Sequence, residues 1–200
     1  MMMFNADDMT LFLAALKFAA VKHRKQRRKD CEATPYINHP IDVAQTLWQI
    51  GGVRDNVLIV GALLHDTLED TDATPEEIEQ HFGSEVLALV QEVTDDKNLP
   101  KLERKRLQIE LAKHKSKRAK QLKLADKSCN VYDITHSMPH NWTLKRCQAY
   151  LDWSEEVVAG LRGVNTALEA HYDTNLIEAR NTLTDSFRLI NVKNSTSSSE

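Results

Sequence analysis

The chain has 200 residues, of which 42% are hydrophobic and 28% charged, and its formal net charge at pH 7 is -3. This composition is typical of one soluble globular domain, and the small net charge excludes a general affinity for nucleic acid. The longest apolar run, Val57–Leu64, is too short to span a membrane, and the first ten residues lack the pattern of a secretory signal. Three scattered cysteines are typical of free thiols, so we expect a cytoplasmic protein.

Helical spacing of apolar residues dominates the chain, and only 6 glycines and 5 prolines interrupt it. The sequence therefore predicts an all-α fold, a single bundle of roughly eight to ten helices without an internal boundary. A cap, a first-turn proline and two first-turn acids in Thr74–Glu77 are typical of a helix start. In chain order, the first three predicted helices cover about residues 8–27, 40–50 and 55–68. A short fourth helix begins at 74, and the fifth includes 86–93. The last three cover about 100–114, 119–134 and 143 through at least 161.

The end of the chain has a different composition. Residues 191–200 contain five Ser or Thr residues and little apolar content, which is typical of a disordered tail. We therefore expect the folded domain to cover residues 1–190.

The third predicted helix ends in an unusual group of side chains. Its run Val57–Leu64 has no polar side chain, which is typical of a helix buried on all sides. His65 and Asp66 continue this run, so we expect them at the edge of the core. Four carboxylates lie within seven residues at this helix end, where the helix dipole disfavours negative charge: Asp66, Glu69, Asp70 and Asp72. A bound cation would offset this repulsion, and the alternative is an acidic, solvated loop.

Asp126 is a second carboxylate that the sequence places against the core. It shares a helical stripe with Leu122 and Cys129, so it faces the apolar side of its helix. Either a basic side chain neutralises it there, or it shares a metal ion with the first group. His39, directly before Pro40, is compatible with a helix cap, a packed core imidazole or a metal ligand.

Together, His39, the pair His65–Asp66 and Asp126 match the order and approximate spacing of the HD superfamily of metal-dependent phosphohydrolases. Three longer strings resemble the hydrolase domain of the RelA/SpoT homologues: Thr34–Pro40, Ala62–Thr71 and Lys123–Lys127. Two more are similar to the small stand-alone members, including the animal-type small alarmone hydrolases: Val93–Lys97 and Leu99–Lys105. The similarity covers about Leu11 to about Leu168 and implies a single helical HD domain.

This resemblance implies one divalent metal ion per chain. Its ligands would be His39, His65, Asp66 and Asp126. Two imidazoles and two carboxylates suit a six-coordinate first-row ion, and the resemblance favours Mn²⁺ without excluding other divalent ions. Glu69 and Asp70 lie about one helical turn beyond Asp66, and the resemblance implies that they orient or deprotonate the attacking water.

Five residues match family positions near the nucleotide: Arg28, Lys29, Asn130, Arg146 and Tyr150. The first two end a basic run, Lys22–Lys29, which is equally typical of a solvated helix end, and Tyr150 is equally compatible with packing alone. Relatives usually carry other residues in place of Ser128 and Cys129, and often in place of Tyr132. The resemblance therefore leaves the shape and charge of the nucleoside pocket open.

The function implied by the resemblance is hydrolysis of alarmones. Such an enzyme removes the 3′-pyrophosphate from guanosine tetraphosphate or pentaphosphate (ppGpp or pppGpp), giving GDP or GTP and pyrophosphate. Two alternatives stay open: the same centre acting on another nucleotide, such as the 2′-phosphate of NADPH, and a nucleotide-binding regulator without turnover. Intact Glu69 and Asp70 favour an enzyme. A small guanosine nucleotide is the expected partner, and the chain could be a monomer or a homodimer.

Overall fold

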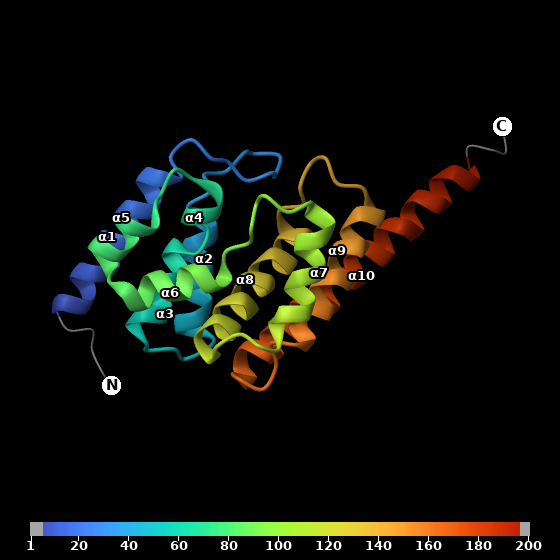
Figure 1. Cartoon of the computed structure of the whole chain (residues 1–200). Coiled ribbons are helices and arrows are strands. Elements are labelled where there is room, and N and C mark those ends of the chain that lie inside the picture. Colours follow the sequence, from blue (N-terminus) through green and yellow to red (C-terminus); the bar gives the residue numbers. More distant parts are fainter. Residues whose placement is uncertain (1–5, 197–200) are drawn as a thin grey trace.

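The computed structural model describes residues 6–196, with side chains described through residue 186, and it confirms the all-α prediction. Within these residues the chain forms ten helices, arranged as in Figure 1. In chain order they are α1 (Ala6–Lys22), α2 (Asn38–Gln49), α3 (Asn56–Leu64), α4 (Thr67–Asp70), α5 (Pro75–Phe82), α6 (Ser84–Val93), α7 (Lys101–Ala112), α8 (Lys117–His136), α9 (Leu144–Ala159) and α10 (Thr166–Thr196). An isolated β-bridge between Arg27 and Pro35 closes the loop between α1 and α2.

The centre of the first half of the fold is α3, which packs against α1, α2, α6 and α8. All residues of Leu58–Leu64 are buried, as expected for a run without polar side chains. The helix is capped by Asp55, whose carboxylate accepts a hydrogen bond from the backbone N–H of Leu58 at 3.3 Å. A Cβ at Gly61 would lie 2.6 Å from Cδ2 of Leu89, so the glycine lets α6 approach this closely.

The helix α8 joins two halves of the molecule. In Figure 1, α1 to α6 lie on one side of it, and α9 and α10 lie on the other. It contacts α2, α3, α6, α9 and α10. Because α8 is surrounded, ten of its residues are buried, and these include the charged Lys123, Asp126 and Lys127. Buried charges of this kind require partners, which α8 and its neighbours must supply.

The start of α5 agrees with the sequence prediction. The hydroxyl of Thr74 accepts a hydrogen bond from the backbone N–H of Glu77 at 3.2 Å, and the carboxylate of Glu77 accepts one from the N–H of Thr74 at 2.9 Å. These two bonds form a capping box, with Pro75 in the first turn. The local sequence alone was sufficient to place this helix start.

Three other helix ends differ from the prediction. The first helix ends at Lys22 instead of near residue 27, and the following residues form the loop to α2. The third ends at Leu64 instead of near residue 68, and after a break at His65 and Asp66 the single turn of α4 begins at Thr67. The helix predicted from Thr143 ends at Ala159, and α10 was not predicted. Gly163, in the connection before α10, has φ of 88°, a conformation that favours glycine.

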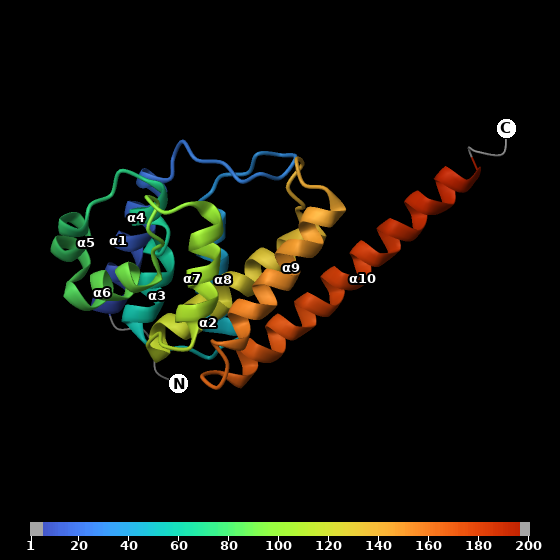
Figure 2. The same ribbon diagram turned by 45° about the vertical axis from the view of Figure 1, so that its right-hand side comes forward.

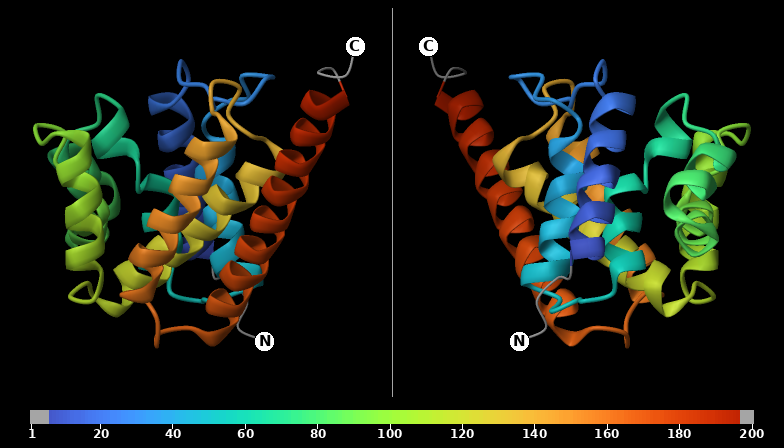
Figure 3. Two further views of the ribbon diagram at one scale, coloured as in Figure 1. Left: turned by 90° about the vertical axis from the view of Figure 1, so that its right-hand side faces the viewer. Right: turned by 90° about the vertical axis from the view of Figure 1, so that its left-hand side faces the viewer.

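The last helix, α10, forms one edge of the molecule and extends past its neighbours (Figure 2). The views in Figure 3 show α10 at one edge and the green helices α5 to α7 at the opposite edge. Its backbone is helical to Thr196, so the tail predicted for residues 191–200 begins inside this helix, and residues 197–200 lie outside the described part. The domain limit at residue 190 stays a prediction. No helix in the described part is long and apolar enough to cross a membrane.

Candidate metal centre and active site

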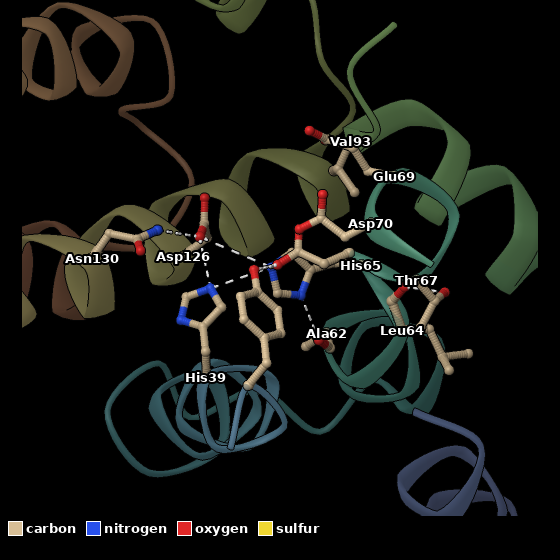
Figure 4. Close-up of polar contacts among 12 residues, drawn as sticks. His39, Ala62, Leu64, His65, Thr67, Glu69, Asp70, Val93, Asp126 and Asn130 are labelled. Carbon is tan, nitrogen blue, oxygen red and sulfur yellow. Dashed lines mark hydrogen bonds and ion pairs between the residues drawn. The ribbon is translucent and has the colours of Figure 1, made fainter. Parts of the chain in front are cut away.

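Three buried side chains from distant parts of the sequence meet at one point (Figure 4). His39 lies in the first turn of α2, His65 directly follows α3, and Asp126 lies in the middle of α8. Their exposed fractions are 3%, 3% and 6%. One nitrogen of each imidazole and one carboxylate oxygen lie within 4.8 Å of one another, so the three side chains could hold a metal ion.

Asp66 extends this group to a cluster of four residues. Its Oδ2 lies 3.1 Å from Nε2 of His65 and 3.9 Å from Nε2 of His39. Oδ1 of Asp126 lies 3.2 Å from Nε2 of His39 and 3.9 Å from Nε2 of His65. Two imidazole nitrogens and two carboxylate oxygens therefore face one common space, and the four residues are those singled out in the sequence.

The imidazole of His65 has a defined orientation. Its Nδ1–H donates a hydrogen bond to the carbonyl of Ala62 at 2.8 Å, which leaves Nε2 facing the cluster. Among the described residues no contact of this buried Nε2 has the geometry of a hydrogen bond, although Oδ2 of Asp66 lies 3.1 Å away. Burial lowers the pKa of His65, but the carboxylates of Asp66 and Asp126 and the carbonyl of Ala62 together outweigh burial and raise it to about 9. Both observations indicate that the cluster favours positive charge here. A metal ion fits this position, because ligating histidines commonly donate their other N–H to a carbonyl.

Asp126 is held by two neighbours on its own helix. Asn130 Nδ2 donates to Oδ1 at 2.6 Å, and Lys127 Nζ donates to Oδ2 at 3.2 Å. Burial raises the pKa of Asp126, but Lys127 and the hydrogen bond with His39 outweigh burial and hold the pKa well below its usual range. Asn130, which the sequence analysis assigned to the substrate, therefore also contacts this carboxylate. The buried Lys127 was not singled out.

Tyr36 is another residue that the sequence analysis missed. Its hydroxyl donates to Oδ2 of Asp66 at 2.6 Å, and its ring lies edge-on to that of His39, with centroids 5.9 Å apart. Tyr36 therefore contacts two members of the cluster. Its position in the string Thr34–Pro40, three residues before His39, was the signal that could have identified it.

Glu69 and Asp70 lie on the single turn of α4, beside the cluster (Figure 4). The Glu69 carboxylate accepts a hydrogen bond from the backbone N–H of Asp95 at 3.2 Å, and burial raises its pKa. Lys97 Nζ lies 2.6 Å from Oδ1 of Asp70 and 3.4 Å from Oε1 of Glu69. The structure thus keeps two carboxylates close to the cluster without including them in it, which suits groups that orient a water molecule.

Two adjoining clefts of about 280 and 500 Å³ lie beside these acids. The smaller cleft contains Arg28, Asn130 and Asp70, and the larger contains Arg146 and Glu69. Three residues line both clefts: Lys29, Trp142 and Tyr150. All five residues that the sequence analysis assigned to the substrate therefore line one or both clefts: Arg28, Lys29, Asn130, Arg146 and Tyr150.

The loop that carries Arg28 and Lys29 forms one wall of both clefts. The Arg28 guanidinium forms an ion pair with Asp133 of α8 and lies 5.8 Å from the centroid of the Tyr36 ring. The carbonyl of Lys29 accepts a hydrogen bond from the backbone N–H of His140 at 2.9 Å. These contacts join the loop to α8 and to the α8–α9 connection, while the Lys29 side chain stays exposed.

The larger cleft is rich in cations and aromatic rings. Besides Lys29, four basic side chains line it: Lys101, Arg104, Lys105 and Arg146. Lys105 Nζ lies 4.3 Å from the centroid of the Trp153 ring, and the Arg146 guanidinium lies 4.5 Å from that of Trp142. Burial and the neighbouring cations lower the pKa of Lys105. Such a surface suits a polyanion that also carries an aromatic ring.

The three residues at which the resemblance implied departures from the family, Ser128, Cys129 and Tyr132, do not line either cleft. The hydroxyl of Ser128 donates to the carbonyl of Leu124 at 2.9 Å, and the ring of Tyr132 stacks on that of His136 at 3.8 Å. Cys129 also lies outside the lining of either cleft in the described part of the chain. The side chains of these three residues therefore contribute nothing to the lining of either cleft.

Comparisons with known proteins agree with this geometry. The family model described as HD domain matches residues 15–148. A Xenopus tropicalis protein named guanosine-3′,5′-bis(diphosphate) 3′-pyrophosphohydrolase MESH1 is 55% identical over 168 residues, which are 84% of this chain and 94% of that protein. The Homo sapiens protein of the same name is 57% identical over 157 residues, which are 78% of this chain and 88% of that protein.

A solved structure supports the same relationship. It is described as a metazoan ortholog of SpoT that hydrolyzes ppGpp and plays a role in starvation responses. It matches with a TM-score of 0.84 and 46% sequence identity, and the match covers 91% of this chain and 99% of that one. The chain therefore belongs to the HD domain family and, within it, to the group of the MESH1 guanosine-3′,5′-bis(diphosphate) 3′-pyrophosphohydrolases.

Proposed function

We propose that this protein hydrolyses the 3′-pyrophosphate of guanosine tetraphosphate or pentaphosphate, giving GDP or GTP and pyrophosphate. The observation that carries the proposal is the buried Nε2 of His65, which faces the carboxylates of Asp66 and Asp126 beside a cleft lined by five basic side chains. The relatives' names and the ppGpp-hydrolysing structural neighbour support the same reaction. The three cysteines are free, which agrees with a reducing cytoplasm as the site of action.

The metal ligands in this proposal are His39, His65, Asp66 and Asp126. Hydrolases of the HD domain family depend on a metal, and two imidazoles with two carboxylates suit a first-row divalent ion. We propose Mn²⁺ as that ion. When bound, it supplies a Lewis acid and lowers the pKa of a coordinated water.

The chain's own residues supply the remaining chemistry. Glu69 and Asp70 orient the attacking water and accept its proton, because their carboxylates lie next to the cluster and face the clefts. Lys29 and Arg146 bind phosphate oxygens with charge-assisted hydrogen bonds. Tyr150, which lines both clefts, packs against the guanine or ribose, and Arg28 and Asn130 close the smaller cleft around the nucleoside.

The test is direct. Purified protein loaded with Mn²⁺ is incubated with ppGpp, and pyrophosphate and GDP are quantified, with NADPH and other nucleotides measured in parallel. We expect stoichiometric GDP and pyrophosphate, loss of turnover in the double variant His65→Ala, Asp66→Ala, and unchanged turnover in His81→Ala, whose side chain is exposed on α5.

Three results would contradict this proposal. Full turnover by the double variant would remove the metal centre from the mechanism. A clear preference for NADPH would replace the substrate. Tight nucleotide and metal binding without product would make the protein a regulator.

A further inference from the structure

His23 is a buried histidine to which the sequence analysis assigned no role. It follows α1 and is only 2% exposed. Its Nδ1 lies 2.6 Å from Oε1 of Gln26, and among the described residues its buried Nε2 has no hydrogen-bond partner. It does not line either of the two clefts, so any effect of His23 on the reaction must pass through its neighbours.

The orientation of the Gln26 amide is decided by Asp70. Gln26 Nε2 lies 3.1 Å from Oδ2 of Asp70 and must donate to it, because an amide oxygen at this distance would repel the carboxylate. The amide oxygen then faces His23, which must donate from Nδ1–H. The result is a directed chain of hydrogen bonds from His23 through Gln26 to Asp70.

A second contact leads from His23 toward the metal cluster. The ring of His23 packs on that of Tyr36, with centroids 4.9 Å apart and an interplanar angle of 34°. The Tyr36 hydroxyl in turn donates to Asp66. His23 therefore supports both ends of α4: Asp66, which precedes this single turn, and Asp70, which ends it.

The hydrogen bond from Gln26 has a specific consequence for the Asp70 carboxylate. Its other oxygen, Oδ1, accepts a hydrogen bond from Lys97 at 2.6 Å, and the Lys97 side chain is 48% exposed. A long, exposed lysine is a weak restraint, because it exchanges readily with water. The bond from Gln26 is also exposed, but its donor differs from Lys97, because the Gln26 amide is held at its other end by the buried ring of His23.

We propose that His23 and Gln26 are positioning residues, which hold the Asp70 carboxylate at the angle needed to orient the attacking water. The inference rests on the proposed function, in which Asp70 handles that water. Neither residue contributes a proton or a ligand to the reaction. Loss of either lets the carboxylate turn with Lys97, so the chemical step slows. Gln26 also lines the smaller cleft, so unchanged nucleotide binding is expected only for loss of His23, which lines neither cleft.

The kinetic test uses His23→Phe, which keeps a ring against Tyr36 but removes the Nδ1 donor. We expect kcat for ppGpp to fall about tenfold while KM stays within about twofold. His23→Asn, whose amide nitrogen occupies approximately the place of Nδ1, should restore most of kcat. His81→Phe is the matched control on exposed α5, with kcat and KM unchanged. A change in KM alone, or equal losses in His23→Phe and His23→Asn, would overturn the proposal.

Gln26→Met provides a second variant at a half-buried position, which guards against misfolding of His23→Phe. If the two residues act as one chain, the double variant should lose no more kcat than the larger single loss, whereas independent roles would multiply the losses. Multiplied losses would overturn the proposal.

Nitrogen-15 NMR of the His23 imidazole gives a readout that does not depend on turnover. We expect a proton on Nδ1 in the wild type, with loss of this preference in Gln26→Met. A wild-type ring with a proton on Nε2 and none on Nδ1 would overturn the proposal even in a fully active enzyme. Absence of ppGpp hydrolysis by the wild type would instead refute the proposed function, and the ring would still report whether the hydrogen-bond chain exists.

Discussion

The buried pair of Lys127 and Asp126 allows a quantitative test of the metal cluster. The variant Lys127→Met keeps most of the apolar stem but removes the ammonium group that lies 3.2 Å from Oδ2 of Asp126. The two side chains are only 6% and 8% exposed, so water cannot replace the lost partner. Removing one member of a buried ion pair costs about 3–5 kcal/mol. Asp126 keeps its hydrogen bond from Asn130, so we expect a loss near 3 kcal/mol in the metal-free protein.

A bound metal ion should reduce this loss. The ion supplies positive charge to Asp126 in place of Lys127, so we expect the metal-loaded variant to lose only about 1 kcal/mol. The two states form a thermodynamic cycle with metal binding, and the difference of about 2 kcal/mol must appear as tighter binding. Lys127→Met should therefore bind Mn²⁺ about 30-fold more tightly than the wild type.

Urea unfolding measures the loss of stability, once with EDTA for the metal-free protein and once with saturating Mn²⁺ for the loaded protein. Calorimetric titration measures the change in Mn²⁺ affinity. Lys123→Met is the matched control, because Lys123 is buried on the same helix but donates to the carbonyl of Val93 at 3.3 Å. Lys123 also lowers the pKa of Asp126, but less than Lys127 does, so its loss should depend on the metal much less than that of Lys127. Equal losses for Lys127→Met in both conditions, or weaker Mn²⁺ binding, would refute the reasoning.

Three further substitutions test packing, capping and ligand orientation. Gly160→Ala places a Cβ 2.7 Å from Cβ of Ala112. This overpacking should cost about 1–3 kcal/mol and lower the melting temperature by roughly 2–12 °C. An unchanged melting temperature would contradict this close contact. Thr74→Ala should cost about 1 kcal/mol in urea unfolding and Thr74→Ser much less, and equal losses would exclude a role for the capping hydroxyl. Tyr36→Phe should release Asp66 and so weaken Mn²⁺ binding about tenfold in calorimetry, with little change in the stability of the metal-free protein. Unchanged affinity would show that the hydroxyl does not orient this ligand.

Local signals in the sequence were sufficient for much of the fold. The capping box of Thr74 and Glu77 and the apolar run Val57–Leu64 depend on neighbours in sequence, and both were interpreted correctly. The break after Leu64 was missed, because neither glycine nor proline marks it. At this break the side chains of His65 and Thr67 bond the carbonyls of Ala62 and Leu64, and helical spacing does not predict such local bonds.

The site shows the same division between local and tertiary information. Helical spacing placed Asp126 toward the core, but the partners of a buried group come from whichever elements pack around it. A helical stripe does not predict the contacts of the supporting residues. Tyr36 bonds Asp66 from another element, Lys127 bonds its own neighbour Asp126, and His23 bonds Gln26 in the loop that follows α1. The resemblance to a family identified the residues of the cluster, and the supporting residues required the structure.

The single turn of α4 has a consequence for the order in which the protein folds. Four residues cannot maintain a helix alone. This turn is held by Thr67, whose fully buried hydroxyl donates to the carbonyl of Leu64 at 2.7 Å, and by Thr71, whose hydroxyl donates to the carbonyl of Thr67 at 2.6 Å. We therefore expect the turn that carries Glu69 and Asp70 to form only after the end of α3 has joined the core. Under gentle warming, activity should disappear before helical circular dichroism does, and a nascent chain should be inactive until its core has closed.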